Sequence, residues 1–276
     1  MKAAVRSRYG PPDVLSVQDI EKPVPKDGEV LIRVHAASVN RSDYHVLTGV
    51  PRPMRCFTGL FRPTLASTGT DFAGQIESIG SKVRRFKPGE NVMGFGGVFG
   101  VGSHAQYLAF DESRGVVSMP NNVTYVQAAA CLEGAYYAAT GLTQINPRAG
   151  QKALVYGATG AIGSAYVQLL KCRGLYVTAV CAGEHRELVM SLGADRIVDY
   201  KTEDFTRDTE RYDFIVESAL PRPEGHSRQP ERDQGFVESG RFKPVIDRQY
   251  PIEKISEAFV YVATGQKIGN VIVTMD

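Results

Sequence analysis

The stretch that decides the fold is Leu154-Val155-Tyr156-Gly157-Ala158-Thr159-Gly160-Ala161-Ile162-Gly163. It reads as an apolar strand, a glycine-rich turn and the start of a helix. Gly157 would allow a tight turn, Gly160 would let the backbone approach a pyrophosphate, and Gly163 would let the helix pack closely on the sheet. The helix N-terminus would offer free amides to the phosphates. The pattern predicts a dinucleotide site over 157–163, and the alternative is a strand-to-helix turn without a ligand.

The sequence on either side of this turn divides into two patterns. Up to residue 122, short alternating strands are separated by glycine and proline turns, which is typical of a small barrel or sandwich. From residue 123, strands and helices alternate, which indicates an α/β region with a parallel sheet. The strands expected in the first region are Lys2–Ser7, Leu15–Ile20, Glu29–Ala37, Asp71–Ile79, Asn91–Phe95 and His104–Phe110. The elements expected afterwards are a helix within Val123–Ile145, strand Lys152–Tyr156, helix Ile162–Arg173, strand Tyr176–Cys181, helix Glu184–Leu192, strands Arg196–Val198 and Phe214–Glu217, helix Ile252–Thr264 and strand Asn270–Thr274.

Composition and charge exclude several classes of function. The chain has 276 residues, a formal net charge of +2 and 43% hydrophobic residues, which is ordinary for a globular protein. We therefore expect neither nucleic acid nor a membrane as a partner. The N-terminus lacks the apolar run of a signal peptide, so a cytoplasmic protein is the expectation. The four cysteines lack metal-ligand spacing, which predicts reduced thiols and no metal site.

The second phosphate of the cofactor is harder to assign. A site selective for NAD(H) usually places a carboxylate at the end of the second strand. Here that strand ends at Cys181 and is followed by Ala182 and Gly183. NADP(H) is therefore favoured, with Arg186 as a candidate to face the 2′-phosphate. NAD(H) remains the alternative, since Glu184 could reach a ribose hydroxyl.

Short stretches spread over most of the chain also resemble one known family. Besides the glycine-rich turn they are Ser38-Val39-Asn40-x-x-Asp43, Gly69-Thr70-Asp71-Phe72-Ala73-Gly74, Phe86-Lys87-Pro88-Gly89-Glu90-Asn91-Val92, Leu192-Gly193-Ala194-Asp195, Val198-Asp199-Tyr200 and Gly240-Arg241-Phe242-Lys243-Pro244-Val245-Ile246-Asp247. The chain resembles the medium-chain dehydrogenase/reductase superfamily, most of all its zinc-free quinone oxidoreductase and enoyl reductase branch. The resemblance implies a GroES-like domain over 1–122 completed by 245–276, and an NAD(P)-binding Rossmann-like domain over 123–244.

The resemblance also implies a reaction and a set of site residues. Hydride would pass between NAD(P)H and a small quinone, enone or carbonyl compound without a metal. Asn40 and His45 would lie at the reaction cleft, and Tyr137 and Tyr200 would contact the cofactor. Zinc-dependent relatives carry a cysteine and a Gly-His-Glu where this chain has 40–43 and 69–71, so no zinc set is visible. For Asn40, His45 and Tyr137 a purely structural role is equally compatible with the sequence.

One departure from the family pattern concerns 219–234. This segment has three prolines, many charges and almost no large apolar residue, which predicts a disordered linker. A full Rossmann sheet has six strands, and two of them with their crossovers would belong here. The Rossmann-like domain is therefore expected to be truncated. A non-catalytic or poorly active homologue that binds nucleotide, or a binding module, is the alternative function, and homo-oligomer formation becomes doubtful.

Overall fold

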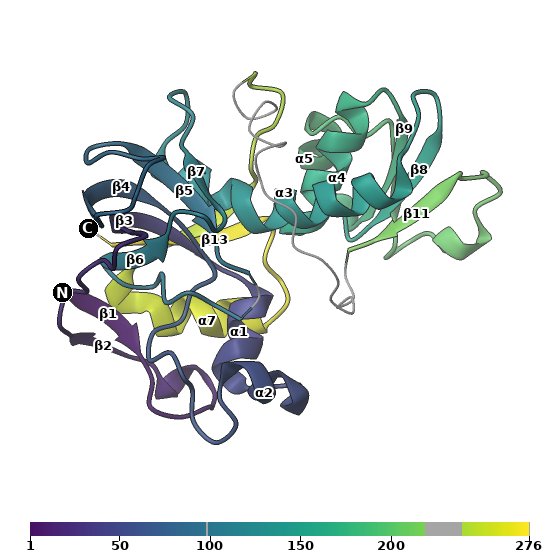
Figure 1. The fold of residues 1–276 in the computed structure, drawn as a ribbon. Coiled ribbons are helices and arrows are strands. Elements are labelled where there is room, and N and C mark those ends of the chain that lie inside the picture. Colours follow the sequence, from purple (N-terminus) through teal and green to yellow (C-terminus); the bar gives the residue numbers. More distant parts are fainter. Residues whose placement is uncertain (98, 219–238, 276) are drawn as a thin grey trace. The chain divides into compact units, whose positions relative to one another are not determined.

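Residues 1–97, 99–218 and 239–275 are described by a computed structural model (Figure 1). Its contacts divide the chain into two compact units. One unit, here called the β-rich unit, comprises Met1–Leu132 and Ile246–Asp276; the other, the parallel-sheet unit, comprises Glu133–Val245. The linker predicted over 219–234 lies outside the described residues. The N-terminal and C-terminal segments thus belong to the same unit.

The β-rich unit is organised around one long strand, β3 (Glu29–Val39), which pairs with β4, β6 and β13. In its described part, seven strands form a sheet in the order β12-β13-β3-β4-β5-β7, with β6 also on β3. Apolar side chains of β3 alternate into a core that includes Val30, Ile32 and Val34. The remaining strands are β1 (Lys2–Val5), β2 (Ser16–Asp19), β4 (Asp71–Ile79), β5 (Asn91–Phe95), β6 (Tyr107–Asp111), β7 (Val116–Ser118), β12 (Ile246–Pro251) and β13 (Asn270–Thr274), with β1 and β2 forming a separate antiparallel pair.

Of three helices in this unit, the sequence predicts one. Helix α7 (Ile255–Ala263) buries Ile255, Ala258, Phe259 and Val262, the spacing of an amphipathic helix, and this confirms the predicted helix. It is shorter than expected because Ile252–Lys254 forms a separate 3-10 turn. The two other helices, α1 (Arg41–Thr48) and α2 (Arg55–Thr58), were not predicted.

The parallel-sheet unit contains the predicted α/β alternation. In the described residues its strands run parallel in the order β10-β9-β8-β11, which is the 3-2-1-4 order of a Rossmann sheet. Strand β11 forms one edge of this described sheet, and its Ile215 side chain is 63% exposed. The elements are β8 (Lys152–Tyr156), α4 (Ala161–Cys172), β9 (Tyr176–Cys181), α5 (Arg186–Ser191), β10 (Arg196–Asp199) and β11 (Phe214–Glu217), with α3 (Tyr125–Ile145) leading in.

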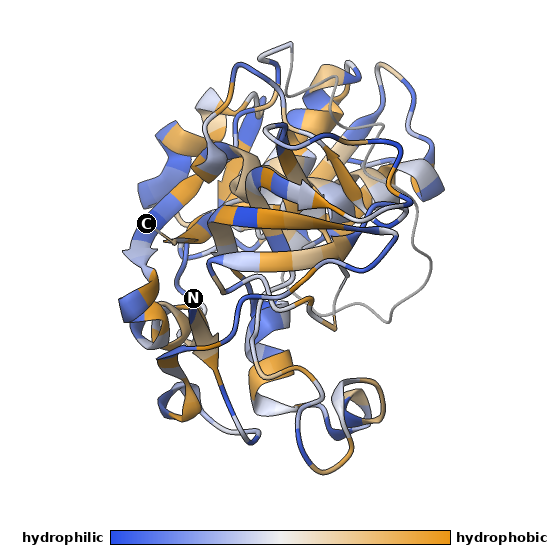
Figure 2. Ribbon diagram, turned by 60° about the vertical axis from the view of Figure 1, so that its left-hand side comes forward, coloured by the Kyte–Doolittle hydropathy of each residue, from blue (hydrophilic) through white to orange (hydrophobic). Residues whose placement is uncertain are grey.

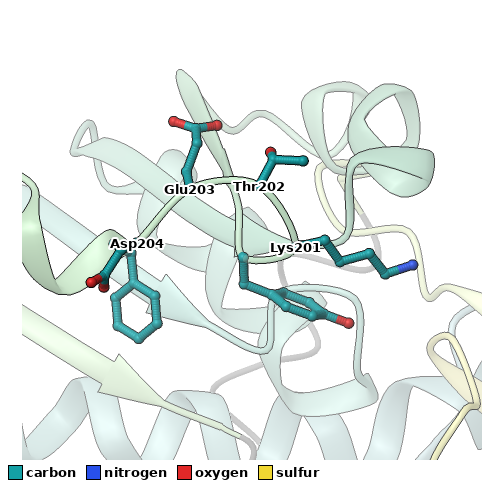
Figure 3. A pocket seen from close by; sticks show the side chains of 6 residues that line it. Lys201, Thr202, Glu203 and Asp204 are labelled. Carbon is teal, nitrogen blue, oxygen red and sulfur yellow. The ribbon is translucent and has the colours of Figure 1, made fainter.

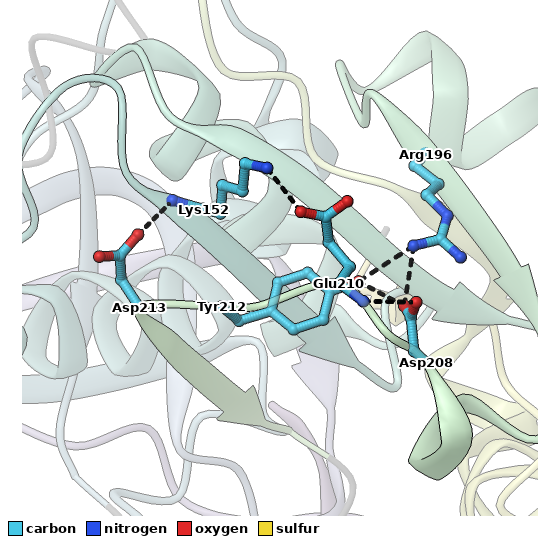
Figure 4. Close-up of polar contacts among 6 residues, drawn as sticks. All are labelled: Lys152, Arg196, Asp208, Glu210, Tyr212 and Asp213. Atoms are coloured by element: carbon cyan, nitrogen blue, oxygen red, sulfur yellow. Dashed lines mark hydrogen bonds and ion pairs between the residues drawn. The ribbon is translucent and has the colours of Figure 1, made fainter.

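A polar cluster ties together the amino-terminal ends of these strands (Figure 4). Asp213, just before β11, accepts a 2.7 Å hydrogen bond from the backbone amide of Lys152 at the start of β8. Arg196, at the start of β10, lies 2.8 Å from the carboxylate of Asp208, which also accepts a 2.6 Å bond from the Tyr212 hydroxyl. The glycine-rich turn follows the opposite, carboxyl-terminal end of β8. The cluster therefore stabilises the sheet at the end opposite to the glycine-rich turn.

Candidate functional site

The glycine-rich turn has the geometry that a phosphate site requires. Strand β8 ends at Tyr156, and Gly157 follows with a φ of 76°, in the region that glycine adopts at no steric cost. Gly160 then takes an extended conformation as the N-cap of α4. The first amides of α4 lack carbonyl partners within the helix. They are therefore available to an anion at the positive end of the helix dipole.

The three glycines of the turn are required for different reasons. A Cβ atom on Gly163 would overlap the carbonyl oxygen of Gly157, so Gly163 keeps α4 close to the end of β8. Among the described residues, a Cβ atom on Gly160 would meet only the Gly157 oxygen, at 3.5 Å, which is an ordinary contact. The protein's own packing thus accounts for Gly157 and Gly163, while the space beside Gly160 remains open. A phosphate group that approaches the backbone there would account for the third glycine.

Helix α3 lies against this turn within the same unit. A Cβ atom on Gly134 would overlap the backbone carbonyl of Ala161, the first residue of α4. Tyr137 follows one helical turn later on α3, and its own carbonyl accepts a 3.5 Å hydrogen bond from the Tyr166 hydroxyl. The helix that carries Tyr137 is therefore packed against the start of α4.

The carboxyl ends of β9 and β10 hold the residues expected at the far end of the cofactor. Ala182 is buried directly after β9, and Arg186 is exposed at the start of α5. Glu184 lies 2.9 Å from the Lys201 ammonium, and this interaction lowers the pKa of the carboxyl. Because parallel strands end at the same edge of a sheet, Ala182 and Tyr200 lie at the edge that carries the glycine-rich turn.

A carboxylate that the sequence did not reveal also lies at this edge. Asp199, the last residue of β10, lies so close to Gly183 that a Cβ atom there would overlap one carboxylate oxygen. Its other oxygen accepts a 2.9 Å hydrogen bond from the backbone amide of Lys201. Asp199 and Gly183 are close because the ends of β9 and β10 are neighbours in the sheet. The sequence of β9 alone therefore does not show that a carboxylate lies there. The register that joins Asp199 to Cys181 is the signal that would have indicated it.

A shallow hollow follows β10 at the same edge. It is lined by Tyr200, Lys201, Thr202, Glu203, Asp204 and Phe205, and Figure 3 shows these side chains around one turn of backbone. The Tyr200 side chain is half-exposed.

In the β-rich unit, Asn40 is part of a buried polar network. Its side-chain amide donates to the hydroxyl of Ser38 and, at 3.3 Å, to the carboxylate of Asp71. Its backbone amide donates at 2.8 Å to the carboxylate of Asp43, which braces the start of α1. These bonds fix the Asn40 side chain and hold the end of β3 against β4.

Two titratable groups in this network are completely buried. Burial raises the pKa of Asp71 to about 6, against the opposing effect of hydrogen bonds from Ser38 and Asn40. Burial also lowers the pKa of His104 to about 4. The His104 ring nitrogens lie 2.8 Å from the Thr68 hydroxyl and 2.9 Å from the Ser38 carbonyl oxygen. A neutral imidazole with one proton satisfies both contacts.

His45 differs from Asn40 because one polar atom of its side chain has no hydrogen-bond partner among the described residues. It lies on α1, and its Nδ1 atom is buried without a hydrogen-bond partner among the described residues. A buried polar atom without a partner is unfavourable by about 1–3 kcal/mol. A polar group of a substrate at this position would remove that penalty.

The donor groups of the described residues do not fit a zinc ion. No cluster of three or more His, Cys, Asp or Glu side chains in this part of the chain could hold a metal. The nearest candidates, Asp71 and His104, already use their polar atoms in hydrogen bonds within the protein. Cys131 and Cys181 are buried, and burial raises the pKa of both thiols, to about 12 for Cys131.

Comparison with known proteins assigns the family. Residues 26–121 match the model of the alcohol dehydrogenase GroES-like domain, and residues 234–273 match that of the zinc-binding dehydrogenases. The 2-methylene-furan-3-one reductase of Solanum lycopersicum is 30% identical over 99% of this chain and 79% of its own length. The chain belongs to the medium-chain dehydrogenase/reductase superfamily. It is thus an oxidoreductase by descent, and the predicted family is confirmed.

Other relatives and solved structures agree with this assignment. The NADPH-dependent alkenal/one oxidoreductase of Arabidopsis thaliana is 30% identical over 99% of this chain and 79% of its own length. The quinone oxidoreductase of Mus musculus is 34% identical over 73% of this chain and 59% of its own. The structure of the quinone oxidoreductase from Coxiella burnetii superposes with a TM-score of 0.87 at 21% identity, covering 100% of this chain and 99% of that one. The last match confirms the fold. Within the described residues, no helix is long and apolar enough to cross a membrane.

Proposed function

We propose that the chain binds NADP(H) at the Gly157–Gly163 turn and passes hydride to a small enone or quinone without a metal. The observation that carries the proposal is the space at Gly160, where the atoms of the described residues do not require a glycine. The relatives support the reaction class, since their names describe a furanone reductase, an alkenal/one oxidoreductase and quinone oxidoreductases. Each of these names describes a compound with a conjugated carbonyl group.

The roles of this chain's own residues follow from the geometry. The amides of Ala161 and Ile162, in the first turn of α4, would hold the pyrophosphate. The nicotinamide ring supplies the hydride when the cofactor is bound. The Nδ1 atom of His45 would bind the substrate's oxygen, and Asn40 would hold the start of α1 that carries His45. Tyr137 and Tyr200 would contact the two ends of the cofactor.

Charge at the carboxyl ends of β9 and β10 supports NADP(H) over NAD(H). Ala182 carries no charge, and Glu184 is already paired with Lys201. Arg186 is exposed and able to face a 2′-phosphate. Asp199 opposes this preference because its carboxylate lies next to Gly183. We therefore expect the chain to prefer NADPH over NADH, and we expect this preference to depend on Arg186. The preference should be smaller than it would be if Asp199 were absent.

The experiment is a paired measurement of binding and turnover. NADPH is titrated onto the protein by calorimetry, and NADPH oxidation is then followed with a panel of quinones and enones. Binding together with turnover of at least one acceptor supports the proposal. Failure to bind NADPH or NADH in a folded sample would contradict it. The cytoplasmic location expected from the sequence stays a prediction, since relatives include chloroplastic and mitochondrial proteins.

A second candidate is a nucleotide-binding homologue with little or no turnover. Its support is the sheet edge at β11, where Ile215 is 63% exposed in the described structure. The alignments to the tomato and bovine relatives run over 315 and 360 positions, more than the 276 residues of this chain. Segments of those relatives therefore lack a counterpart here, as expected for an internal deletion. NADPH binding without oxidation by any acceptor would favour this candidate.

A further inference from the structure

The segment that contains α2 presents an unusual set of side chains to solvent. The exposed fractions are 68% for Phe57, 58% for Leu60 and 86% for Phe61. Arg52 and Arg62 are exposed beside them, and neither has an ion-pair partner in the described part of the chain. Between Asp43 and Asp71 the sequence contains no acidic residue. The residues 50–65 are called the basic-aromatic segment below.

Hydrogen bonds and ring contacts hold the backbone of the basic-aromatic segment in place. The Tyr9 hydroxyl lies 2.8 Å from the Thr58 hydroxyl and donates a 2.6 Å bond to the Gly59 carbonyl oxygen. Arg55 donates at 3.1 Å to the Gly49 carbonyl and stacks over the Tyr9 ring. These contacts anchor the segment to Tyr9 and Gly49 of the β-rich unit. Phe57, Leu60 and Phe61 are therefore exposed although the backbone that carries them is held in place.

Exposed aromatic groups on a fixed backbone are unfavourable in water. Burial of such a large apolar side chain is favourable because its surface is removed from water. Phe57 stacks on Phe99 at 4.8 Å between ring centroids, so the two rings form a small apolar ridge. Figure 2 shows hydrophobic and hydrophilic residues alternating at the lower end of the ribbon, where α2 lies in Figure 1. A surface of this kind indicates a partner that offers both apolar and anionic groups.

We propose that the basic-aromatic segment binds the surface of an anionic lipid bilayer. Phenylalanine and leucine enter the boundary between headgroups and acyl chains, while arginine binds the lipid phosphates. The charge distribution favours lipid over a second copy of this chain, because this surface offers its own copy no acidic group to pair with Arg52 and Arg62. The binding is peripheral and reversible, since the segment contributes only a few side chains.

Vesicle sedimentation tests this inference without reference to the cofactor. The full chain is mixed either with vesicles of phosphatidylcholine alone or with vesicles in which about a third of the lipid is phosphatidylglycerol, which is anionic. We expect binding to the anionic vesicles that falls as salt is raised. The variant Arg62→Gln should lower the partition coefficient about fivefold and Phe61→Ser about tenfold.

Matched substitutions provide the controls. Val24→Ser removes an apolar side chain that is 84% exposed outside the segment, and Arg211→Gln removes an exposed arginine from the parallel-sheet unit. Both should bind like the wild type. If either test variant fails to fold, Leu60→Ser and Arg52→Gln replace it.

Three results would overturn the inference. They are equal binding to neutral and anionic vesicles, no loss of binding in Arg62→Gln and Phe61→Ser, and absence of vesicle binding. A concentration-dependent dimer that Phe61→Ser dissociates, seen by light scattering without vesicle binding, would instead identify a self-association surface. Because NADPH titration of the same samples is independent of lipid, failure here is distinguishable from failure of the proposed function.

Discussion

The carbonyl oxygen of Gly157 occupies the place that a side chain on Gly163 would take. Two glycines six residues apart in the sequence thus share one volume, where the end of β8 meets the first turn of α4. This contact sets the distance between strand and helix. It also leaves Gly160, between them, facing open space.

Valine substitutions at the two positions should therefore have different effects. Gly163→Val places a branched side chain against backbone and should lower the free energy of unfolding by several kcal/mol. A Cβ atom at position 160 meets no atom of the described residues closer than 3.5 Å, so we expect the fold of Gly160→Val to persist while NADPH affinity falls at least tenfold. Chemical denaturation and calorimetric titration of both variants measure the two effects. Unchanged NADPH affinity in a folded Gly160→Val protein would count against the phosphate site.

Local patterns explain why the parallel-sheet unit was read correctly from sequence. Strand β8, the glycine turn and α4 follow one another within about twenty residues, and the turn requires glycine for local reasons. Strand β12 (Ile246–Pro251) was missed because its side chains are half-buried or exposed and carry no apolar alternation. Its parallel pairing with β13 stabilises it, and pairing of this kind is a tertiary effect.

The basic-aromatic segment was missed for a different reason. The net charge of +2 is a sum over the whole chain, so it does not indicate that the stretch between Asp43 and Asp71 contains no acidic residue. Exposure of Phe57 and Phe61 depends on how Tyr9 anchors the backbone, which no local pattern encodes. Asp199 beside Gly183 belongs to the same class of findings, because the contact joins the ends of two strands.

Cofactor preference should depend on Arg186. Replacing it with glutamine removes one charge from the carboxyl edge of the sheet, and a charge-assisted hydrogen bond contributes about 1.5–3 kcal/mol. We expect NADPH affinity to fall about tenfold and NADH affinity to remain unchanged. Titration of both cofactors onto Arg186→Gln and the control Arg211→Gln measures the difference. Equal losses for both cofactors would place Arg186 elsewhere than at the 2′-phosphate.

The stability of the β-rich unit should respond to pH through His104. Its pKa is about 4 in the folded chain against 6.5 for the free side chain, so the unfolded chain binds more protons between these values. Stability from this group is present above pH 6.5 and is lost as the pH falls, by about 2 kcal/mol at pH 5. Denaturation of the wild type and His104→Gln at pH 7 and pH 5 tests this.

Asp71 should act in the opposite direction in the same window. Its folded pKa of about 6 lies above the ordinary 3.8, so the folded chain binds the extra proton and gains stability as the pH falls. Removing His104 should therefore leave a flat or rising stability towards pH 5. A steeper acid loss in His104→Gln than in the wild type would show that the imidazole is not held neutral.

Metal removal should leave the protein unaffected. Asp71 and His104 are satisfied within the protein, and no other donor cluster is present in the described residues. We expect less than one equivalent of zinc by elemental analysis, and unchanged NADPH oxidation after dialysis against a chelator. One tightly bound zinc ion per chain, with loss of activity on its removal, would contradict this expectation.

The most direct test of the account is NADPH oxidation by the wild type and by Gly160→Val, with one quinone and one enone as acceptors. We predict turnover of at least one acceptor by the wild type, and a loss of kcat/KM of at least tenfold in Gly160→Val at unchanged thermal stability. Equal turnover by the two proteins would contradict the claim that the Gly157–Gly163 turn holds the cofactor from which hydride is transferred.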